Sequence, residues 1–416
     1  MIVKYAKIFT ETEGFLPGDL HIRGDKLAQV VISSDRDSIK ENIVGFQATG
    51  LDGRPVESNI TSSEYRNASA AIEEEVIDAT GLYAIPGLTD LHFHGCVGYD
   101  FCDGSTAAIS NMAEYQVRNG ITQICPATMT LKEEVLADIF RTVAAYDKSY
   151  NPQGAILCGI NMEGPYISVK KKGAQNERYI HKPDVGMFRR LQSISGNRIK
   201  LTAIAPEEEG AMDFISELKD EVVVSIAHTN ADYVTTMEAF HRGAGQVTHL
   251  YNAMPPFTHR APGVIGAAFD TPGCYVELIC DGIHIHPSVV RATFRLFGED
   301  RVILISDSMK ATGMPDGVYE LGGQAVRVSG RSASLISDGA LAGSVTNLME
   351  CMRNCVMSMG IPLESAVKGA AVNPAKAIGI YDSYGSLTPG KIANLVLLDD
   401  KLEIKAVILK GVRIDL

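Results

Sequence analysis

Two patterns of hydrophobic and polar positions divide the chain. At both ends, short runs alternate apolar and polar residues and are separated by turn-forming residues, which is typical of antiparallel β-structure. Between the ends, short apolar runs alternate with windows that repeat apolar residues every three or four positions, as amphipathic helices do. This middle pattern predicts strands over residues 121–126, 155–162, 201–205, 222–227, 275–280 and 302–306, and helices over residues 107–119, 131–146, 231–242 and 287–297.

Repeated strand–helix units predict an α/β protein with a parallel sheet. The 416 residues suit a (β/α)8 TIM-like barrel of about 250–300 residues with a smaller partner domain. We therefore expect a barrel over residues 85–384 and a small β-sandwich domain formed from residues 1–84 and 385–416. The polar, irregular segment 34–71 is interpreted as an insertion. No glycine-rich phosphate loop follows a predicted strand, so a nucleotide-binding fold has no support.

Charge and composition narrow the range of partners. A formal charge of -12 argues against nucleic acid, which usually requires a basic face, and an anionic substrate would need a local positive pocket. The eight cysteines include no CxxC pair and predict reduced thiols. The first residues lack the apolar core of a signal peptide, and no run approaches the ~18 apolar residues of a membrane helix. We expect a cytoplasmic protein.

Candidate metal ligands follow the predicted strands. His92 and His94 are two residues apart, so on a strand both would point to one face, into the barrel. Glu163, His228 and His249 each end another apolar run. A parallel barrel gathers the carboxyl ends of its strands at one mouth, and imidazole and carboxylate are common ligands of divalent metals. A single one of these residues could be structural or solvated, but together they predict a metal-dependent enzyme.

Asp307 is the candidate acid–base group. It follows the apolar run 302–306, so its carboxylate would emerge at the same mouth. A carboxylate there can accept a proton from an activated water and return it to a leaving amine. The structural alternative is capping of a helix that begins at residue 308.

These motifs resemble a known family. Residues 86–95 (PGLTDLHFHG) are similar to the first-strand motif of the amidohydrolase superfamily. The more specific segments 163–165, 172–176, 227–231, 248–254 (THLYNAM), 259–263, 281–284, 306–307 and 341–344 resemble those of the N-acetylglucosamine-6-phosphate deacetylase family, and the likeness covers nearly the whole chain.

The resemblance implies a role for each matching residue. It implies hydrolysis of the N-acetyl group of N-acetylglucosamine 6-phosphate in amino-sugar catabolism, with Glu163, His228 and His249 as main metal ligands and Asp307 as general base and acid. Zinc is the expected metal, with iron, manganese or cobalt as alternatives. The implied substrate-binding positions are Ala174, Gln175, Asn252, Ala253, Arg260, His284, Leu341, Ala342 and Gly343. The resemblance also implies a homodimer in which the neighbouring subunit can supply a phosphate ligand.

Two features depart from part of that family. Some members lack the equivalents of His92 and His94 and use one metal, so their presence predicts a second ion with Glu163 bridging. Many members carry histidine where this chain has Gln175, which can donate a hydrogen bond but cannot become cationic. A second metal could supply the missing polarisation of the acetyl carbonyl.

Three rival functions stay open at this point. N-acetylgalactosamine 6-phosphate differs from the expected substrate in the orientation of one hydroxyl, which the motifs do not reveal. A non-catalytic phosphosugar-binding relative should have lost ligands or the acid–base carboxylate. An amidohydrolase acting on cyclic amides or nucleosides would more often carry a carboxylated lysine in place of Glu163 and would not need the segment around Arg260.

Overall fold

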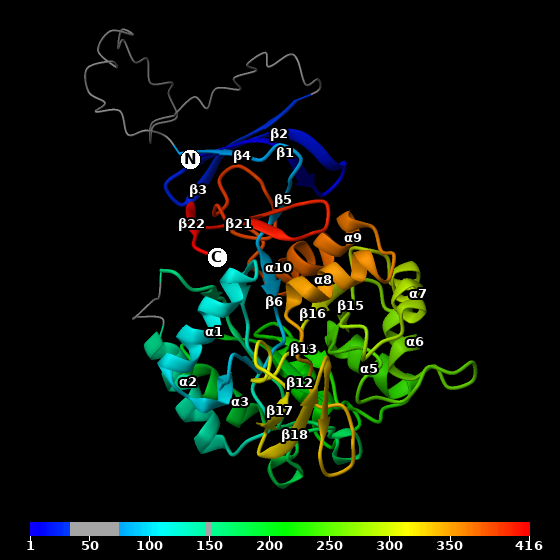
Figure 1. Cartoon of the computed structure of the whole chain (residues 1–416). Helices are drawn as coiled ribbons and strands as arrows, with labels where there is room; N and C mark the ends of the chain where they lie inside the picture. The colour runs from blue at the N-terminus through cyan, green and yellow to red at the C-terminus, as the bar shows by residue number, and fades with distance from the viewer. Residues whose placement is uncertain (34–74, 147–151) are drawn as a thin grey trace, which may run out of the picture.

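The computed structural model describes residues 1–33, 75–146 and 152–416. Its centre is a curled parallel sheet (Figure 1), with strands in the order β6 (Leu88–Asp90), β9 (Ile121–Ile124), β10 (Ile156–Leu157) continued by β11 (Ile160–Met162), β12 (Ile199–Ile204), β13 (Val223–Ile226), β14 (Gln246–Val247), β15 (Tyr275–Ile279) and β16 (Val302–Ile305). The predicted strands are confirmed, with ends that differ by at most two residues, and the predicted run 155–162 forms the two short strands β10 and β11.

Backbone hydrogen bonds just beyond the strands complete the barrel. The amide of Asn161 donates to the carbonyl of Pro126 over 2.9 Å, which joins the β9 and β11 sides. The amide of Asp307, two residues after β16, donates to the carbonyl of His92 over 2.8 Å, which joins the last strand to the first. The predicted TIM-like barrel is therefore confirmed, and the closing bonds lie at the carboxyl ends of the strands, where the ligand candidates are.

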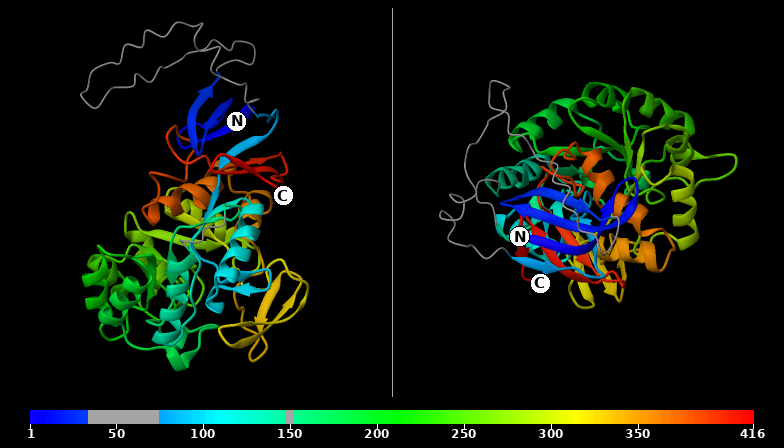
Figure 2. Two further views of the ribbon diagram at one scale, coloured as in Figure 1. Left: turned by 90° about the vertical axis from the view of Figure 1, so that its left-hand side faces the viewer. Right: turned by 90° about the horizontal axis from the view of Figure 1, so that it is seen from above.

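Helices surround the sheet, as the view along the barrel shows (Figure 2). Four helices match the predicted windows: α1 (Thr106–Arg118), α2 (Glu133–Tyr146), α5 (Tyr233–Arg242) and α7 (Pro287–Phe297). Gly243 and Gly298 cap α5 and α7 with positive φ of 121° and 76°, a conformation that glycine adopts without strain. The periodicity analysis missed the helices α3 (Val185–Ile194), α4 (Ala211–Leu218), α6 (Gly263–Asp270), α8 (Leu348–Met357), α9 (Leu363–Val367) and α10 (Asn373–Ala377), together with the π-helical turn η5 (Lys368–Val372) between the last two.

The two termini build one mixed sheet. Its strands run in the order β22 (Val412–Ile414), β21 (Ile404–Leu409), β20 (Leu395–Leu398), β5 (Tyr83–Pro86), β1 (Ile2–Thr10), β2 (Gly14–Arg23) and β3 (Lys26–Ile32), and β4 (Val76–Asp78) pairs with β1. Both halves contribute to one apolar cluster that includes Ile8, Leu20, Leu395 and Ile408. The expected sandwich is thus a single sheet that folds around its own core. The domain boundaries at 84/85 and 384/385 stay a prediction.

A small antiparallel sheet was not foreseen. Strands β17 (Gly317–Leu321), β18 (Gln324–Ser329) and β19 (Ser332–Leu335) follow the barrel strand β16. They lie at the end of the barrel opposite the terminal sheet (Figure 1), and Leu321 and Val326 pack with Met129 in a separate apolar cluster. The small sheet therefore covers part of the barrel mouth.

Two further sequence expectations concern the segment 34–71 and membrane-spanning helices. The proposed insertion 34–71 lies outside the described residues. Within the residues that are described, no helix is both long and apolar enough to cross a membrane.

Candidate active site

Three strand ends bring a carboxylate and two imidazoles together. Glu163 directly follows β11, and His228 and His249 lie two residues beyond β13 and β14. Nε2 of His228 is 3.1 Å from Glu163 Oε1, Nε2 of His249 is 3.2 Å from the same oxygen, and the two Nε2 atoms are 3.2 Å apart. All three side chains are buried. The sequence prediction that these residues converge is correct.

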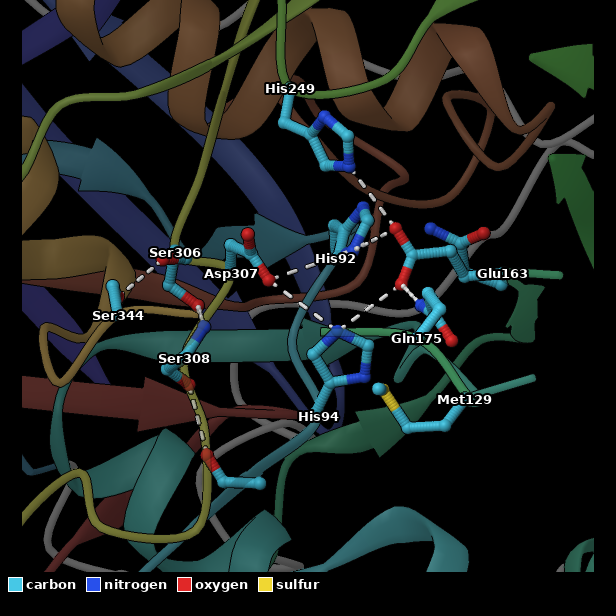
Figure 3. A network of polar contacts seen from close by, with 12 residues as sticks. His92, His94, Met129, Glu163, Gln175, His249, Ser306, Asp307, Ser308 and Ser344 are labelled. Atoms are coloured by element: carbon cyan, nitrogen blue, oxygen red, sulfur yellow. Dashed lines mark hydrogen bonds and ion pairs between the residues drawn. The ribbon is translucent and has the colours of Figure 1, made fainter. Parts of the chain in front are cut away.

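His92 and His94 contact the same carboxylate (Figure 3). Nε2 of His92 lies 3.4 Å from Glu163 Oε1, and Nε2 of His94 lies 3.3 Å from Glu163 Oε2. Two groups of possible ligands result, His92–His94–Glu163 and Glu163–His228–His249, and within each group the ligand atoms lie within 4.8 Å of one another. Glu163 belongs to both groups.

The donor chemistry fits a divalent metal. Nδ1 of His228 lies 2.9 Å from the carbonyl of Lys171, which can only accept, so this contact orients the ring with Nε2 toward Glu163. Nε2 of His92 is buried without a hydrogen-bond partner among the described residues. Several imidazole nitrogens and a carboxylate around one point are the usual ligands of zinc and similar ions. The site is therefore a buried His/Glu metal-binding site.

Electrostatics at this cluster favour a cation. Burial alone would lower the pKa of His94, but Asp307 and Glu163 raise it to about 9. For Glu163, burial alone would raise the pKa, but His92 and the other surrounding histidines hold it well below its ordinary value. The cluster thus keeps its carboxylates ionised in a buried place, and the resulting negative potential attracts a metal ion as it attracts protons.

Asp307 faces the metal-binding site from β16. Its Oδ1 is 3.4 Å from His94 Nε2 and 3.8 Å from His92 Nε2. Burial opposes ionisation, but hydrogen bonding to His94 and the charge of the histidines lower the pKa of Asp307, so it is a carboxylate that can accept a proton. Residues 308–316 contain no helix, which removes helix capping as the reason for an aspartate here.

His228, His249 and Asp307 share an unusual backbone conformation. His228, His249 and Asp307 have φ of 43°, 31° and 47°, in the left-handed region that side chains other than glycine rarely adopt. Such a conformation costs about 1–3 kcal/mol per residue and persists where the surrounding structure enforces it, often at functional sites. The sharp turn lets each strand end present its side chain at the barrel mouth.

Serine side chains fix the strand end that carries Asp307 (Figure 3). Ser306 Oγ donates to Asp90 Oδ2 over 2.5 Å, which ties β16 to β6. Ser344 Oγ donates to the carbonyl of Ser306 over 2.6 Å, and its amide donates to the carbonyl of Asp307 over 2.7 Å. These bonds bring the segment 341–343 next to Asp307, although more than 30 residues separate them in sequence.

A cavity of about 380 Å³ opens over these groups. Its walls include most of the predicted residues: His94, Glu163, His228, His249, Asp307, Ala174, Gln175, Asn252, Ala253, His284, Leu341 and Gly343. His92 and Ala342 are buried and do not line it. Arg260 is exposed and does not line the cavity. The structure therefore does not show Arg260 in position to contact a phosphate bound in the cavity of its own subunit.

Gln175, a predicted substrate-binding residue, contacts the central carboxylate of the site. Its Nε2 donates to Glu163 Oε2 over 2.7 Å, and its Oε1 accepts from the amide of Thr130 over 2.7 Å. The side chain therefore orients the central carboxylate of the site. Its amide group retains a second hydrogen, so Gln175 at the cavity wall can still face a substrate.

His284 is held in place by Asp281. Nδ1 of His284 lies 2.7 Å from Asp281 Oδ2, and the same carboxylate accepts from the amides of Ile283 and His284. Burial alone would lower the pKa of His284, but Asp281 raises it above its ordinary value. A positively charged imidazole at the cavity wall can bind an anionic group of a ligand.

Residues that the sequence analysis missed support this site. Glu277, in the middle of β15, is fully buried, accepts from Gln246 Nε2 over 2.6 Å and from the amide of His249 over 3.2 Å, and lies 3.4 Å from His92 Nδ1. A glutamate inside an otherwise apolar run was the signal that could have identified it. Met129, Lys170, Lys171, Gly173, Leu321 and Ala340 complete the cavity wall.

A barrel of this kind, with a histidine- and glutamate-lined metal-binding site at the carboxyl ends of its strands, defines a class of hydrolases. Residues 83–414 match the model of the Amidohydrolase family. A deacetylase of N-acetylglucosamine 6-phosphate from Bacillus subtilis (strain 168) is 37% identical over 390 residues, which cover 92% of this chain and 96% of that protein. The chain therefore belongs to the amidohydrolase family and, within it, to the N-acetylglucosamine-6-phosphate deacetylases.

One further relative and two solved structures are also similar to this chain. A deacetylase of N-acetylgalactosamine 6-phosphate from Escherichia coli O157:H7 is 33% identical and covers 82% of this chain and 91% of its own. The crystal structure of the N-acetyl-D-glucosamine-6-phosphate deacetylase from Mycobacterium smegmatis aligns with a TM-score of 0.85 and 29% identity over the whole of both chains. A mutant of that enzyme in complex with N-acetyl-D-glucosamine-6-phosphate aligns with a TM-score of 0.84 at 29% identity and covers 99% of this chain and 98% of its own.

Glu277→Gln tests how far the buried carboxylate supports the ligands. Glutamine has the same size, but its amide group cannot accept from both Gln246 and His249, so we expect metal affinity to fall about 10- to 100-fold with the fold retained. Titration against a competing chelator measures the affinity. Glu238→Gln, at an ion pair with Arg242 on the outside of α5, is the matched control. Unchanged affinity in Glu277→Gln would contradict the supporting role.

Proposed function

We propose that this enzyme hydrolyses the N-acetyl group of N-acetylglucosamine 6-phosphate to give glucosamine 6-phosphate and acetate. The observation that carries the proposal is the placement of Asp307 beside the Glu163–His228–His249 group, at the floor of a cavity whose wall includes Asn252 and His284. The cavity volume of about 380 Å³ lies in the range of small-molecule sites. Relatives named for this reaction support the substrate.

The geometry supports the following proposed roles for a few groups. Glu163, His228 and His249 would hold a divalent cation, which would supply Lewis-acid chemistry for activating water at neutral pH and for stabilising negative charge on the acetyl oxygen. Asp307 accepts the proton of the attacking water and then delivers it to the sugar nitrogen as the C–N bond breaks. His284 and the backbone around Ala253 hold the phosphosugar, while Ala174, Gln175 and the segment 341–343 enclose the acetyl end.

The rival readings are weaker on the same geometry. A non-catalytic relative would have no use for Asp307 among the histidines, held there at a cost in backbone conformation. A carboxylated lysine has no place at the site, where Glu163 stands between the two ligand groups. The galacto epimer remains the second candidate, because the relative from Escherichia coli O157:H7 is named for it.

A deacetylation assay on three sugars tests the proposed function. We expect acetate release from N-acetylglucosamine 6-phosphate to be fastest, slower release from the galacto epimer, and at least a ~10-fold lower kcat/KM for unphosphorylated N-acetylglucosamine, since charge-assisted contacts to phosphate would be lost. Faster turnover of the galacto epimer would favour the second candidate. Equal kcat/KM with and without phosphate would remove the roles given to His284 and Arg260.

Asp307→Asn tests the proton transfer. Asparagine has the same shape but cannot accept the proton of water, so we expect kcat to fall by about 10²–10⁴-fold while the metal content and the fold persist. Steady-state kinetics on the metal-loaded variant, with its metal content measured in the same preparation, make the comparison. Near-normal turnover by a loaded Asp307→Asn enzyme would exclude Asp307 as the proton carrier.

We infer two ions per chain, with zinc as the preferred metal. The His92–His94 pair supports this inference because both rings reach Glu163, which can bridge two ions. Gln175 supports it too, since it cannot supply the positive charge of a histidine. Metal analysis of active enzyme purified without chelator should give a ratio of two, and His92→Asn should give one. A stable ratio of one in the fully active wild-type enzyme contradicts the second ion.

Arg260 supports a homodimer. Arg260 and Phe257 are both exposed and belong to the segment between β14 and α6, and no ion pair holds Arg260 among the described residues. A planar, permanently charged guanidinium there is suited to the phosphate of a substrate bound in a neighbouring subunit. A protein that sediments as a monomer at assay concentrations yet is fully active would rule out the homodimer.

The eight free cysteines support a reducing, cytoplasmic compartment.

A further inference from the structure

The cavity carries positive charge that none of the expected substrate-binding positions accounts for. Lys170 and Lys171 both contribute to its wall. Arg260, the cation expected to bind phosphate, is exposed and absent from this wall. In a chain with a formal charge of -12, two lysines at one concave site are a strong local exception.

Lys171 connects the metal-binding end of the cavity with the loop after β14. Its carbonyl accepts from Nδ1 of the candidate ligand His228 over 2.9 Å. Its ammonium extends the other way and donates to the carbonyl of Met254 over 3.3 Å. Met254 directly follows Asn252 and Ala253, both of which line the cavity. The Lys171 ammonium is therefore held beside the wall that we expect to receive the phosphosugar.

The charges of Lys170 and Lys171 are not neutralised. In the part of the chain that the structure describes, neither lysine forms an ion pair, whereas the neighbouring Lys172 pairs with Glu177 over 3.2 Å and does not line the cavity. A single carbonyl contact leaves the positive charge of the Lys171 ammonium in place. Inside a partly enclosed cavity such a charge attracts a dianionic group more strongly than at an open surface.

We infer that Lys171, with Lys170 as a second charge, is the cation with which each subunit binds the substrate's phosphate from within its own cavity. This inference rests on the proposed function. An ammonium acts on phosphate as a point charge, so it needs no planar alignment and suits a side chain already held by the Met254 carbonyl. His284 and the Lys171 ammonium then supply positive charge from two different elements, the segment after β15 and the short helix η3 (Val169–Lys171).

Three adjacent lysines provide a matched comparison. For Lys171→Met we expect KM for N-acetylglucosamine 6-phosphate to rise at least ~10-fold, kcat to stay within ~3-fold, and kcat/KM for unphosphorylated N-acetylglucosamine to stay unchanged. Lys170→Met should show a smaller rise of the same kind, and Lys171→Arg should restore most of the affinity. Lys172→Met, whose side chain pairs outside the cavity, should leave every constant unchanged.

A role limited to holding the loop through the Met254 carbonyl predicts something different. In that case Lys171→Met would impair phosphorylated and unphosphorylated sugars equally, and this result would overturn the inference. If Lys171→Met does not fold, Lys170→Met provides the same comparison. Within the described part of the chain, the Lys170 ammonium makes no hydrogen bond or ion pair whose loss would affect folding.

Binding of inorganic phosphate separates this inference from the proposed reaction. Titration calorimetry of metal-loaded Asp307→Asn protein should show phosphate binding that is weakened at least ~10-fold in the double variant Asp307→Asn/Lys171→Met. This comparison needs no turnover, so it holds even if the assay finds another preferred sugar. Equal phosphate affinity in the two proteins would overturn the inference while leaving the proposed deacetylation standing.

Discussion

The shared carboxylate of Glu163 is the interaction on which the rest of the site depends. It lies 3.1 to 3.4 Å from the Nε2 atoms of four histidines that come from three different strand ends. Four imidazoles this close together would repel one another once protonated, and a buried carboxylate without them would be poorly stabilised. The carboxylate reduces the repulsion among the imidazoles, and the imidazoles stabilise the buried carboxylate. The cluster therefore forms only when all of its strands are in place. The barrel satisfies this requirement, since it brings the carboxyl ends of non-adjacent segments to one point.

Holding these groups has a cost that the barrel interior offsets. His228, His249 and Asp307 adopt left-handed backbone conformations, and Glu277 is a fully buried carboxylate in the middle of a strand. Each is unfavourable alone, at about 1–3 kcal/mol for such a backbone conformation. The apolar strands that precede them, such as Val302–Ile305 with every residue buried, supply the burial energy that keeps the strand ends fixed. Strain and buried charge therefore concentrate at the mouth, where function needs them.

The sequence predicted those parts of the molecule in which chemistry and periodicity coincide. A charged or imidazole side chain directly after an apolar run marks the end of a barrel strand, which is why Glu163, His228, His249 and Asp307 were identified as a group. The small sheet β17–β19 was missed because it is an insertion with its own apolar cluster around Met129 and Leu321, and no barrel periodicity signals it. Glu277 and Lys171 were missed for another reason. Their roles depend on contacts across the barrel, with His92 and His249 in one case and with His228 and Met254 in the other, and such contacts have no counterpart in local pattern.

The contacts of Lys171 link the two ends of the cavity. Its backbone carbonyl orients the ring of His228, and its side chain reaches the loop that contains Asn252 and Ala253. A displacement of η3 would therefore disturb a candidate metal ligand and the proposed phosphate-binding wall together. For a hydrolase that must place an acetyl carbon next to its acid–base group while binding an anion at the other end of the same small molecule, this coupling fixes the distance between the two subsites. Precise positioning of that kind contributes to rate as much as the reacting groups do.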